Sequence, residues 1–188
     1  MHKSLDLFAG CGGLSRGLEW AGFECVAYNE INKSAADSFA LNFPDAIRLD
    51  GDIVTSVTDD VVRDVVLPAA GDGGVDLVCG GPPCQGFSGI GHRRSYSVDK
   101  KELPTNHLFH EMIRVIEAVR PKAFLFENVR GLLSSRWTSD SEPGGIFRDV
   151  WGAFSSIRGY VAQPTLLHGY GFGVPQNRPR VMIMGVKE

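Results

Sequence analysis

Cys84 is the residue whose surroundings in this sequence most favour covalent chemistry. It follows Gly80-Gly81-Pro82-Pro83, just after an apolar run, 75–79, that predicts a buried strand. A cysteine thiolate is a strong nucleophile when it is exposed and stabilised as the anion. The prolines restrict the backbone that would hold this sulfur. A lone cysteine is more often an inert, buried side chain, and the local sequence leaves both interpretations open.

Glu127 is the acid that we expect on the same side of the molecule. The apolar run 123–126 predicts a strand that leads into Glu127-Asn128-Val129. If this strand lies parallel to 75–79, their carboxyl ends meet at one edge of the sheet, with Glu127 near Cys84. A buried carboxylic acid there can donate a proton to a ring nitrogen. The alternative is a glutamate that caps a helix starting near Val129.

A glycine-rich turn, 9–13, follows the first predicted strand, 5–8, and opens a helix. Glycines at this point let the backbone approach a ligand at a helix N-terminus. The signal is weak alone, because Ser15 stands where the third glycine of the dinucleotide motif would be. Glu30 ends the second strand and can accept hydrogen bonds from ribose hydroxyls, while Asp52 can reach an adenine amino group. Each acid alone is equally well explained as the end of a strand in solvent, but together with the turn the two acids favour an adenosine-containing ligand.

Two basic segments are candidates for substrate contacts. Gln176-Asn177-Arg178-Pro179-Arg180 precedes the last strand, and its arginines can bind a substrate oxygen or a phosphate. The segment 88–105 mixes Gly, Ser and His with Arg93, Arg94 and two lysines, which predicts a mobile loop that contacts phosphates. A solvated charge is the simpler interpretation for any one of these residues.

Strands and helices alternate along the chain, and the strands are nearly continuous apolar runs. This pattern predicts an α/β fold with a doubly wound, mostly parallel sheet and helices on both faces. A helix capped by Thr58 should end at Pro68. The other predicted strands are 24–29, 160–167 and 181–186, and the other predicted helices are 14–21, 34–43, 108–119 and 146–157.

The composition is that of an ordinary globular protein. The 188 residues carry a net charge of −3, with 43% hydrophobic and 22% charged residues, so any affinity for nucleic acid must come from a local basic surface. No apolar run reaches roughly 18 residues, so no membrane span or membrane partner is predicted, and a cytoplasmic location is the default. Cys79, Cys84 and His92 fit no common zinc spacing, and no metal site is expected.

Six segments in this order resemble the cytosine carbon-5 DNA methyltransferase family, and the resemblance covers nearly the whole chain. They are residues 6–13 (DLFAGCGG), 29–30 (NE), 51–53 (GDI), 83–85 (PCQ), 127–129 (ENV) and 176–180 (QNRPR). The resemblance implies a Rossmann-like fold that uses S-adenosylmethionine. It also implies one catalytic domain over residues 1–188, with a cofactor-binding half over about 1–80 and a catalytic half over about 81–188.

The resemblance also implies a role for each matched residue. Cys84 corresponds to the nucleophile, Glu127 to the acid at cytosine ring nitrogen 3, and Arg178 and Arg180 to the substrate-site arginines. Glu30 corresponds to the ribose-binding acid. The full set of implied cofactor contacts is Phe8, Ala9, Gly10, Gly12, Leu14, Glu30, Ile31, Asp52, Ile53, Pro83 and Leu108.

The implied reaction is methylation of a cytosine flipped out of double-stranded DNA, through a covalent adduct with Cys84. Ser88, Arg93 and Arg94 would contact the DNA. Ile31 stands where many members have an aromatic residue against the adenine, so an aliphatic contact replaces stacking. Transfer RNA is a minor alternative substrate, because a few relatives act on RNA.

The sequence stops at Glu188, before the target-recognition region with which family members continue. We expect a fragment, or one subunit whose missing part is a second polypeptide, as in split bacterial members of restriction–modification systems. The chain alone should bind the cofactor weakly. Two other classes compete: a non-catalytic module that binds the cofactor or a partner, and a nucleotide-dependent oxidoreductase, which would leave Pro83-Cys84-Gln85 unexplained.

Overall fold

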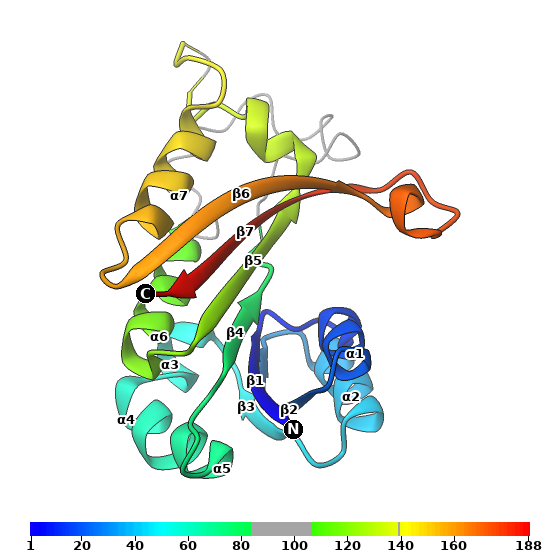
Figure 1. Ribbon diagram of the computed structural model, residues 1–188, viewed down its shortest axis with the longest axis vertical. Helices are drawn as coiled ribbons and strands as arrows, with labels where there is room; N and C mark the ends of the chain where they lie inside the picture. The colour runs from blue at the N-terminus through cyan, green and yellow to red at the C-terminus, as the bar shows by residue number, and fades with distance from the viewer. Residues whose placement is uncertain (84–106, 139) are drawn as a thin grey trace.

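A seven-stranded sheet organises the molecule in the computed structural model, which describes residues 1–83, 107–138 and 140–188. The strand order is β3-β2-β1-β4-β5-β7-β6, and every strand except β7 runs in the same direction (Figure 1). The strands are β1 (His2–Leu7), β2 (Phe23–Glu30), β3 (Ile47–Asp50), β4 (Leu77–Gly80), β5 (Ala123–Val129), β6 (Tyr160–His168) and β7 (Pro179–Lys187).

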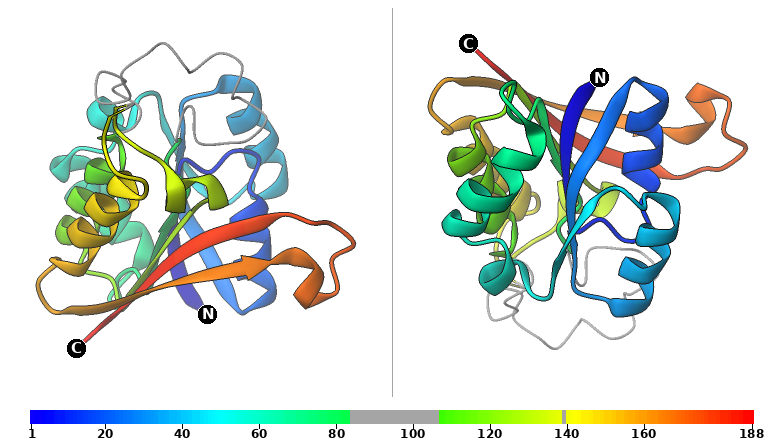
Figure 2. Two further views of the ribbon diagram at one scale, coloured as in Figure 1. Left: turned by 90° about the horizontal axis from the view of Figure 1, so that it is seen from above. Right: turned by 90° about the horizontal axis from the view of Figure 1, so that it is seen from below.

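Helices lie on both faces of the sheet, as the alternating pattern predicts. Figure 2 shows α1 and α2 on one side and the remaining α-helices on the other. The helices are α1 (Gly13–Trp20), α2 (Lys33–Asn42), α3 (Ile53–Ser56), α4 (Asp59–Val61), α5 (Leu67–Ala70), α6 (Phe109–Val119) and α7 (Gly145–Ser155). Shorter helical turns are η1 (Val62–Val66), η4 (Arg130–Ser134) and η5 (Gly169–Phe172).

The core lies between the sheet and the larger helical layer. The predicted stripe of α6 faces it, with Met112, Val115 and Ile116 fully buried against strand residues such as Phe124. Burying such side chains stabilises the fold by about 1.5–3 kcal/mol each. The helix ends at Arg120, just before Pro121. The predicted fold class and the elements on either side of the glycine turn are therefore confirmed.

Two features differ from the sequence expectation. The four-residue strand β3 was not predicted, because only Leu49 among its residues is buried and no periodicity is visible. The prediction that Pro68 ends a helix is wrong. The preceding turn widens into the π-helix η1, so that Leu67 donates its N–H to the Val62 carbonyl. Pro68 then enters at the start of α5, where a missing N–H leaves no bond unmade, and the helix ends at Gly71.

The face of β6 and β7 that points away from α7 is exposed and partly apolar. Ile183 is fully buried, whereas its neighbour Met184 is 51% exposed. Val161 and Val186 face each other across the two strands and are 55% and 53% exposed. The distal end of this pair of strands projects beyond the sheet as an arm (Figure 1). Large apolar surface of this kind marks an interaction site more often than a free surface.

Candidate active site

The glycine turn joins β1 to α1 at the carboxyl edge of the sheet. Its backbone is unusual: Phe8, Gly10 and Gly12 have φ angles of +56°, +56° and +92°. Of these three residues, Phe8 alone carries a side chain, and the left-handed region is a strained conformation for such a residue. The turn is attached to the neighbouring strand β2, because the Ala9 N–H donates to the Asn29 carbonyl (3.0 Å). A Cβ at Gly10 would meet no atom within 4 Å, so the turn is open on its outer side.

Glu30 lies directly beside this turn. Its Oε2 accepts the Gly10 N–H at 2.8 Å, and its Oε1 accepts the Asn32 N–H at 2.7 Å. The carboxylate is therefore oriented by backbone amides, and each oxygen keeps a second lone pair for a ligand hydroxyl. The alternative that Glu30 merely ends its strand in solvent does not explain these two bonds.

The other implied cofactor residues lie at the neighbouring strand ends. Ile31 is 69% exposed, which leaves its side chain free to contact a ligand. Asp52 is exposed and caps α3 by accepting the Val54 N–H at 2.9 Å. Ile53 is only 3% exposed and packs in the core, so little of its side chain is available. Leu108 is half-buried at the start of α6.

The remaining members of this set are consistent with a ligand on the turn. Ala9 and Gly12 are buried within it, Leu14 is half-buried on α1, and Pro83 is exposed after β4. An open glycine turn, a fixed acid on the next strand and exposed aliphatic surface beside it are the parts that an adenosine ligand requires. The residues present therefore fit S-adenosylmethionine.

Glu127 and Arg180 form a charged centre where β5 and β7 lie side by side. Glu127 Oε1 lies 2.5 Å from Arg180 Nε, with both side chains largely withdrawn from solvent, 28% and 18% exposed. The pair bridges β5 and β7, which are antiparallel at this point. Glu127 does not cap the following helical turn, for which no side-chain cap is present. The capping alternative is therefore wrong.

Gly81 connects this centre to the segment that leads to Cys84. A Cβ built on Gly81 would lie 2.8 Å from Glu127 Oε2. The carboxylate thus lies against the backbone just past β4, three residues before Cys84 in the sequence. The expectation that parallel β4 and β5 bring Glu127 to the end of β4 is confirmed.

Asn128 is a residue that sequence reasoning named only as part of a motif. It is 4% exposed and donates from Nδ2 to the Pro82 carbonyl at 3.0 Å. Since alternate residues of a strand point to opposite faces, Glu127 and Asn128 contact the β4 end from its two sides. The Glu-Asn pair after a predicted strand was the available signal for this arrangement.

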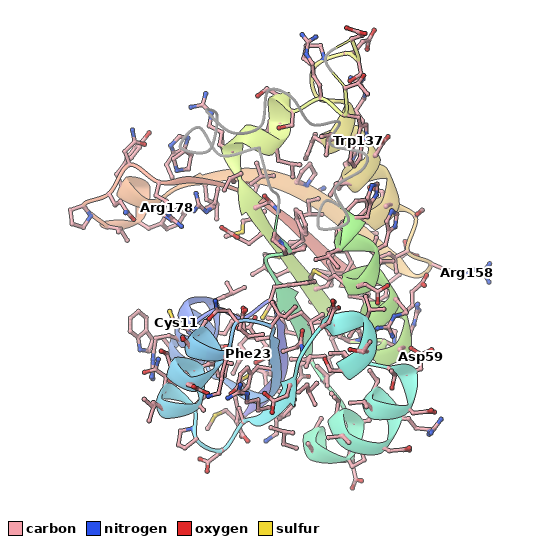
Figure 3. The ribbon with its side chains drawn as sticks, turned by 180° about the vertical axis from the view of Figure 1, so that it is seen from behind. Cys11, Phe23, Asp59, Trp137, Arg158 and Arg178 are labelled. Carbon is pink, nitrogen blue, oxygen red and sulfur yellow. The ribbon has the colours of Figure 1, made fainter. Side chains whose placement is uncertain are left out.

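Several predicted site residues are not brought together with this centre. Arg178 is exposed in the segment before β7, out on the arm (Figure 3). Cys84, Ser88, Arg93 and Arg94, like His92, lie outside the described residues.

Among the residues that the structure describes, no cluster of three or more His, Cys, Asp or Glu side chains could hold a metal ion. No helix within the described ranges is long and apolar enough to span a bilayer.

A sequence profile of the C-5 cytosine-specific DNA methylases matches residues 2–188. The chain belongs to this family. Type II methyltransferase M1.HphI of Haemophilus parahaemolyticus is 37% identical over 185 residues, which are 98% of this chain and 45% of that protein. M.AgeI of Thalassovita gelatinovora is 37% identical over 99% of this chain and 40% of its own length. The chain thus spans less than half the length of these relatives.

Solved structures share the fold. A protein described as a DNA modification methyltransferase encoded within an E. coli prophage superposes with a TM-score of 0.76 at 29% identity, over the whole chain and 47% of its own length. A Dnmt2 variant from Spodoptera frugiperda gives 0.70 at 25% identity, over the whole chain and 50% of its own length. The Rossmann-like methyltransferase fold expected from the resemblance is confirmed.

Proposed function

We propose that this chain is the catalytic part of an enzyme that transfers a methyl group from S-adenosylmethionine to carbon 5 of cytosine in DNA. The observation that carries the proposal is the position of Glu127. Arg180 holds its carboxylate against Gly81, just before the Pro82-Pro83-Cys84 segment. An acid fixed beside a nucleophile suits addition to an aromatic ring.

In the proposed reaction the Cys84 thiolate adds to carbon 6 of the cytosine. Glu127, in its protonated form, delivers a proton to ring nitrogen 3 as the thiolate adds, which moves electron density toward carbon 5, and the resulting carboxylate takes that proton back when Cys84 is eliminated. Carbon 5 takes the methyl group, the proton at that carbon leaves to a base, and elimination of Cys84 restores the aromatic ring. Arg180 keeps the Glu127 carboxylate in place and can also donate to the cytosine oxygen. Arg178 lies on the arm, so we propose that it contacts the substrate at a point further from the cytosine ring.

The proposed cofactor site is the glycine turn with Glu30, Ile31 and Asp52 beside it. When bound, S-adenosylmethionine supplies a methyl group activated by a positively charged sulfur. Glu30 would bind the ribose hydroxyls, Asp52 the adenine amino group and Ile31 the adenine face. Phe8, Ala9, Gly10, Gly12, Leu14, Pro83 and Leu108 would form the rest of the contact surface, and Ile53, whose side chain is buried, would contact the cofactor through its backbone.

The substrate in this proposal is double-stranded DNA with the target base flipped out, because a base stacked in the duplex cannot enter an active site. Ser88, Arg93 and Arg94 would contact the phosphate backbone near that base. Phosphate contacts by arginine depend strongly on salt, so variants at Arg93 and Arg94 should reduce the salt dependence of DNA binding.

We also propose that residues beyond these 188 complete the molecule, either as a continuation of the chain or as a second polypeptide. The two relatives from Haemophilus parahaemolyticus and Thalassovita gelatinovora are more than twice as long, and Val161, Met184 and Val186 leave an apolar sheet face exposed. Calorimetry should therefore find weak S-adenosylmethionine binding by the chain alone, and at least tenfold tighter binding when the downstream polypeptide is co-expressed. Equal affinity in both preparations would contradict this part of the proposal.

The function is tested by assaying labelled methyl transfer to duplex DNA, with the chain expressed alone and with the downstream polypeptide. Nucleoside analysis should identify 5-methylcytosine as the product, and Cys84→Ala and Glu127→Gln should lower the rate by at least about a hundredfold. Transfer RNA is assayed in parallel. Methylation of RNA but not of DNA would show that DNA is not the substrate. A preparation that binds the cofactor and DNA but transfers no methyl group would indicate a non-catalytic module instead.

A further inference from the structure

Asp6 is a buried carboxyl group that the proposed reaction does not use. It is 1% exposed, near the carboxyl end of β1, and Cys79 of β4 and Tyr28 of β2 are its register partners. Burial raises the pKa of Asp6 from 3.8 to about 6, because the charged form loses its hydration. A carboxylate in such a place reduces folding stability, so its presence calls for a role.

The hydrogen bond that Asp6 makes spans the glycine turn. Ser15 donates from Oγ to Asp6 Oδ2 at 2.5 Å, and Ser15 is itself only 2% exposed. Asp6 lies just before the turn and Ser15 in the first helical turn after it. Every residue between them, including the strained Phe8 and Gly10, lies within the loop that this bond closes. Strained backbone persists only where its surroundings fix it.

The groups that face Asp6 offer it no compensating positive charge. They are the hydroxyl and backbone N–H of Ser15 from α1, the Cys79 thiol from β4, and Glu30 and Cys25 from β2. Glu30 repels it as a like charge. Burial raises the pKa of Cys25 to about 12 and that of Cys79 well above its usual range, so both thiols are neutral. The hydroxyl of the adjacent Tyr28 donates to the Ala36 carbonyl instead.

We propose that Asp6 is a positioning residue for the cofactor site. Through Ser15 it holds the two ends of the glycine turn together, and the turn loosens when Asp6 takes up a proton. The ionised carboxylate accepts a strong, charge-assisted bond from Ser15, whereas the neutral acid accepts a weaker one. The inference rests on the proposed function in one respect, namely that the turn binds S-adenosylmethionine.

The first test follows the turn without any cofactor. In nuclear magnetic resonance spectra, the Gly10 and Gly12 amide signals should move between pH 8 and pH 5 with one midpoint near the titration of Asp6. In Asp6→Asn they should stay constant over that range. The same movement in Asp6→Asn, or no movement in the unaltered protein, overturns the proposal, whatever the chain is later found to bind.

The second test measures the dissociation constant of S-adenosylmethionine by equilibrium dialysis across the same pH range. The unaltered protein should lose at least about fivefold in affinity at pH 5, and Asp6→Asn should show a flat profile. Ser15→Ala should bind at least about fivefold more weakly at pH 8. Asp76→Asn is the matched control, because Asp76 accepts the Lys3 N–H and pairs with Lys122 at the opposite edge of the sheet. It should follow the unaltered profile.

The outcomes separate the two proposals. If the glycine amides titrate with Asp6 but no preparation binds the cofactor, the cofactor site is wrong and the positioning role stands. If the cofactor binds and Asp6→Asn keeps the unaltered pH dependence, the positioning role is wrong and the cofactor site stands.

Discussion

At the scale of single residues, the position of the Glu127 carboxylate depends on the missing side chain of a glycine. Gly81 has no Cβ, and this is what allows the Glu127 carboxylate to lie against the end of β4. Arg180 then fixes the carboxylate from β7 and Asn128 holds the Pro82 carbonyl from the other face of β5. The carboxylate is thus positioned by Arg180 and by the backbone that follows β4, and such support is how sites gain precision.

Replacing Gly81 by alanine should displace the Glu127 carboxylate without unfolding the protein. The new Cβ would come within 2.8 Å of Oε2, the far end of a side chain that can move. We expect methyl transfer to fall by about tenfold or more, because small displacements of a catalytic group are costly, while the melting temperature changes little. Gly73→Ala, at a loop position with no atom within 4 Å of a new Cβ, should leave both unchanged. An active Gly81→Ala protein would show that the position of the carboxylate does not matter.

At the scale of elements, the glycine turn combines two different requirements. Gly12 faces inward, where a Cβ would lie 2.6 Å from the Phe43 ring, whereas Gly10 faces open space. Both have positive φ angles. One glycine is thus needed for packing of α1 against α2, and the other leaves room on the outer side of the turn.

The two glycines should therefore respond differently to alanine. Gly12→Ala should destabilise the fold by about 1–3 kcal/mol, through a clash with a packed aromatic ring and an unfavourable φ. Gly10→Ala should reduce stability by about 1 kcal/mol or less, yet weaken S-adenosylmethionine binding markedly. Thermal unfolding and calorimetry on both variants check this. If both variants bind S-adenosylmethionine as tightly as the unaltered protein, there is no ligand above Gly10. The same follows if only Gly12→Ala binds it weakly.

Much of this arrangement could be predicted from the sequence, because each strand that ends in the site is an apolar run followed by polar or glycine residues. That logic placed Glu30 and Glu127 correctly at the carboxyl edge. It missed β3, whose single buried residue leaves no pattern, and misplaced the helix end at Pro68, since a π-helical turn leaves no signature in residue type. The Asp6–Ser15 bond was also out of reach, because it depends on which way two side chains point across the turn.

At the scale of the whole molecule, folding stability should depend on pH through Asp6. Because the pKa of Asp6 is raised to about 6 in the folded protein, the folded state favours the protonated form. The stability that this group contributes is fully present below about pH 4 and is lost as pH rises through about 6. A shift of this size corresponds to about 3 kcal/mol.

Asp6→Asn should remove this dependence. Compared with the unaltered protein, the variant should be more stable at pH 8 by up to about 3 kcal/mol, with little difference at pH 4. Thermal or urea unfolding at the two pH values provides the measurement. If Asp6→Asn loses as much stability between pH 4 and pH 8 as the unaltered protein does, the pH dependence of folding stability comes from another group.

We propose that Cys84 attacks carbon 6 of a cytosine while Glu127 assists at ring nitrogen 3. Duplex DNA containing 5-fluorocytosine tests it most directly, because the fluorine cannot leave as a proton does and the adduct is trapped after methyl transfer. With S-adenosylmethionine and the completed protein, mass spectrometry should find one DNA strand covalently joined to the peptide that contains Cys84. Cys84→Ser should give no adduct. An adduct at another residue, or methylation of ordinary DNA with no adduct at all, would show that Cys84 is not the nucleophile.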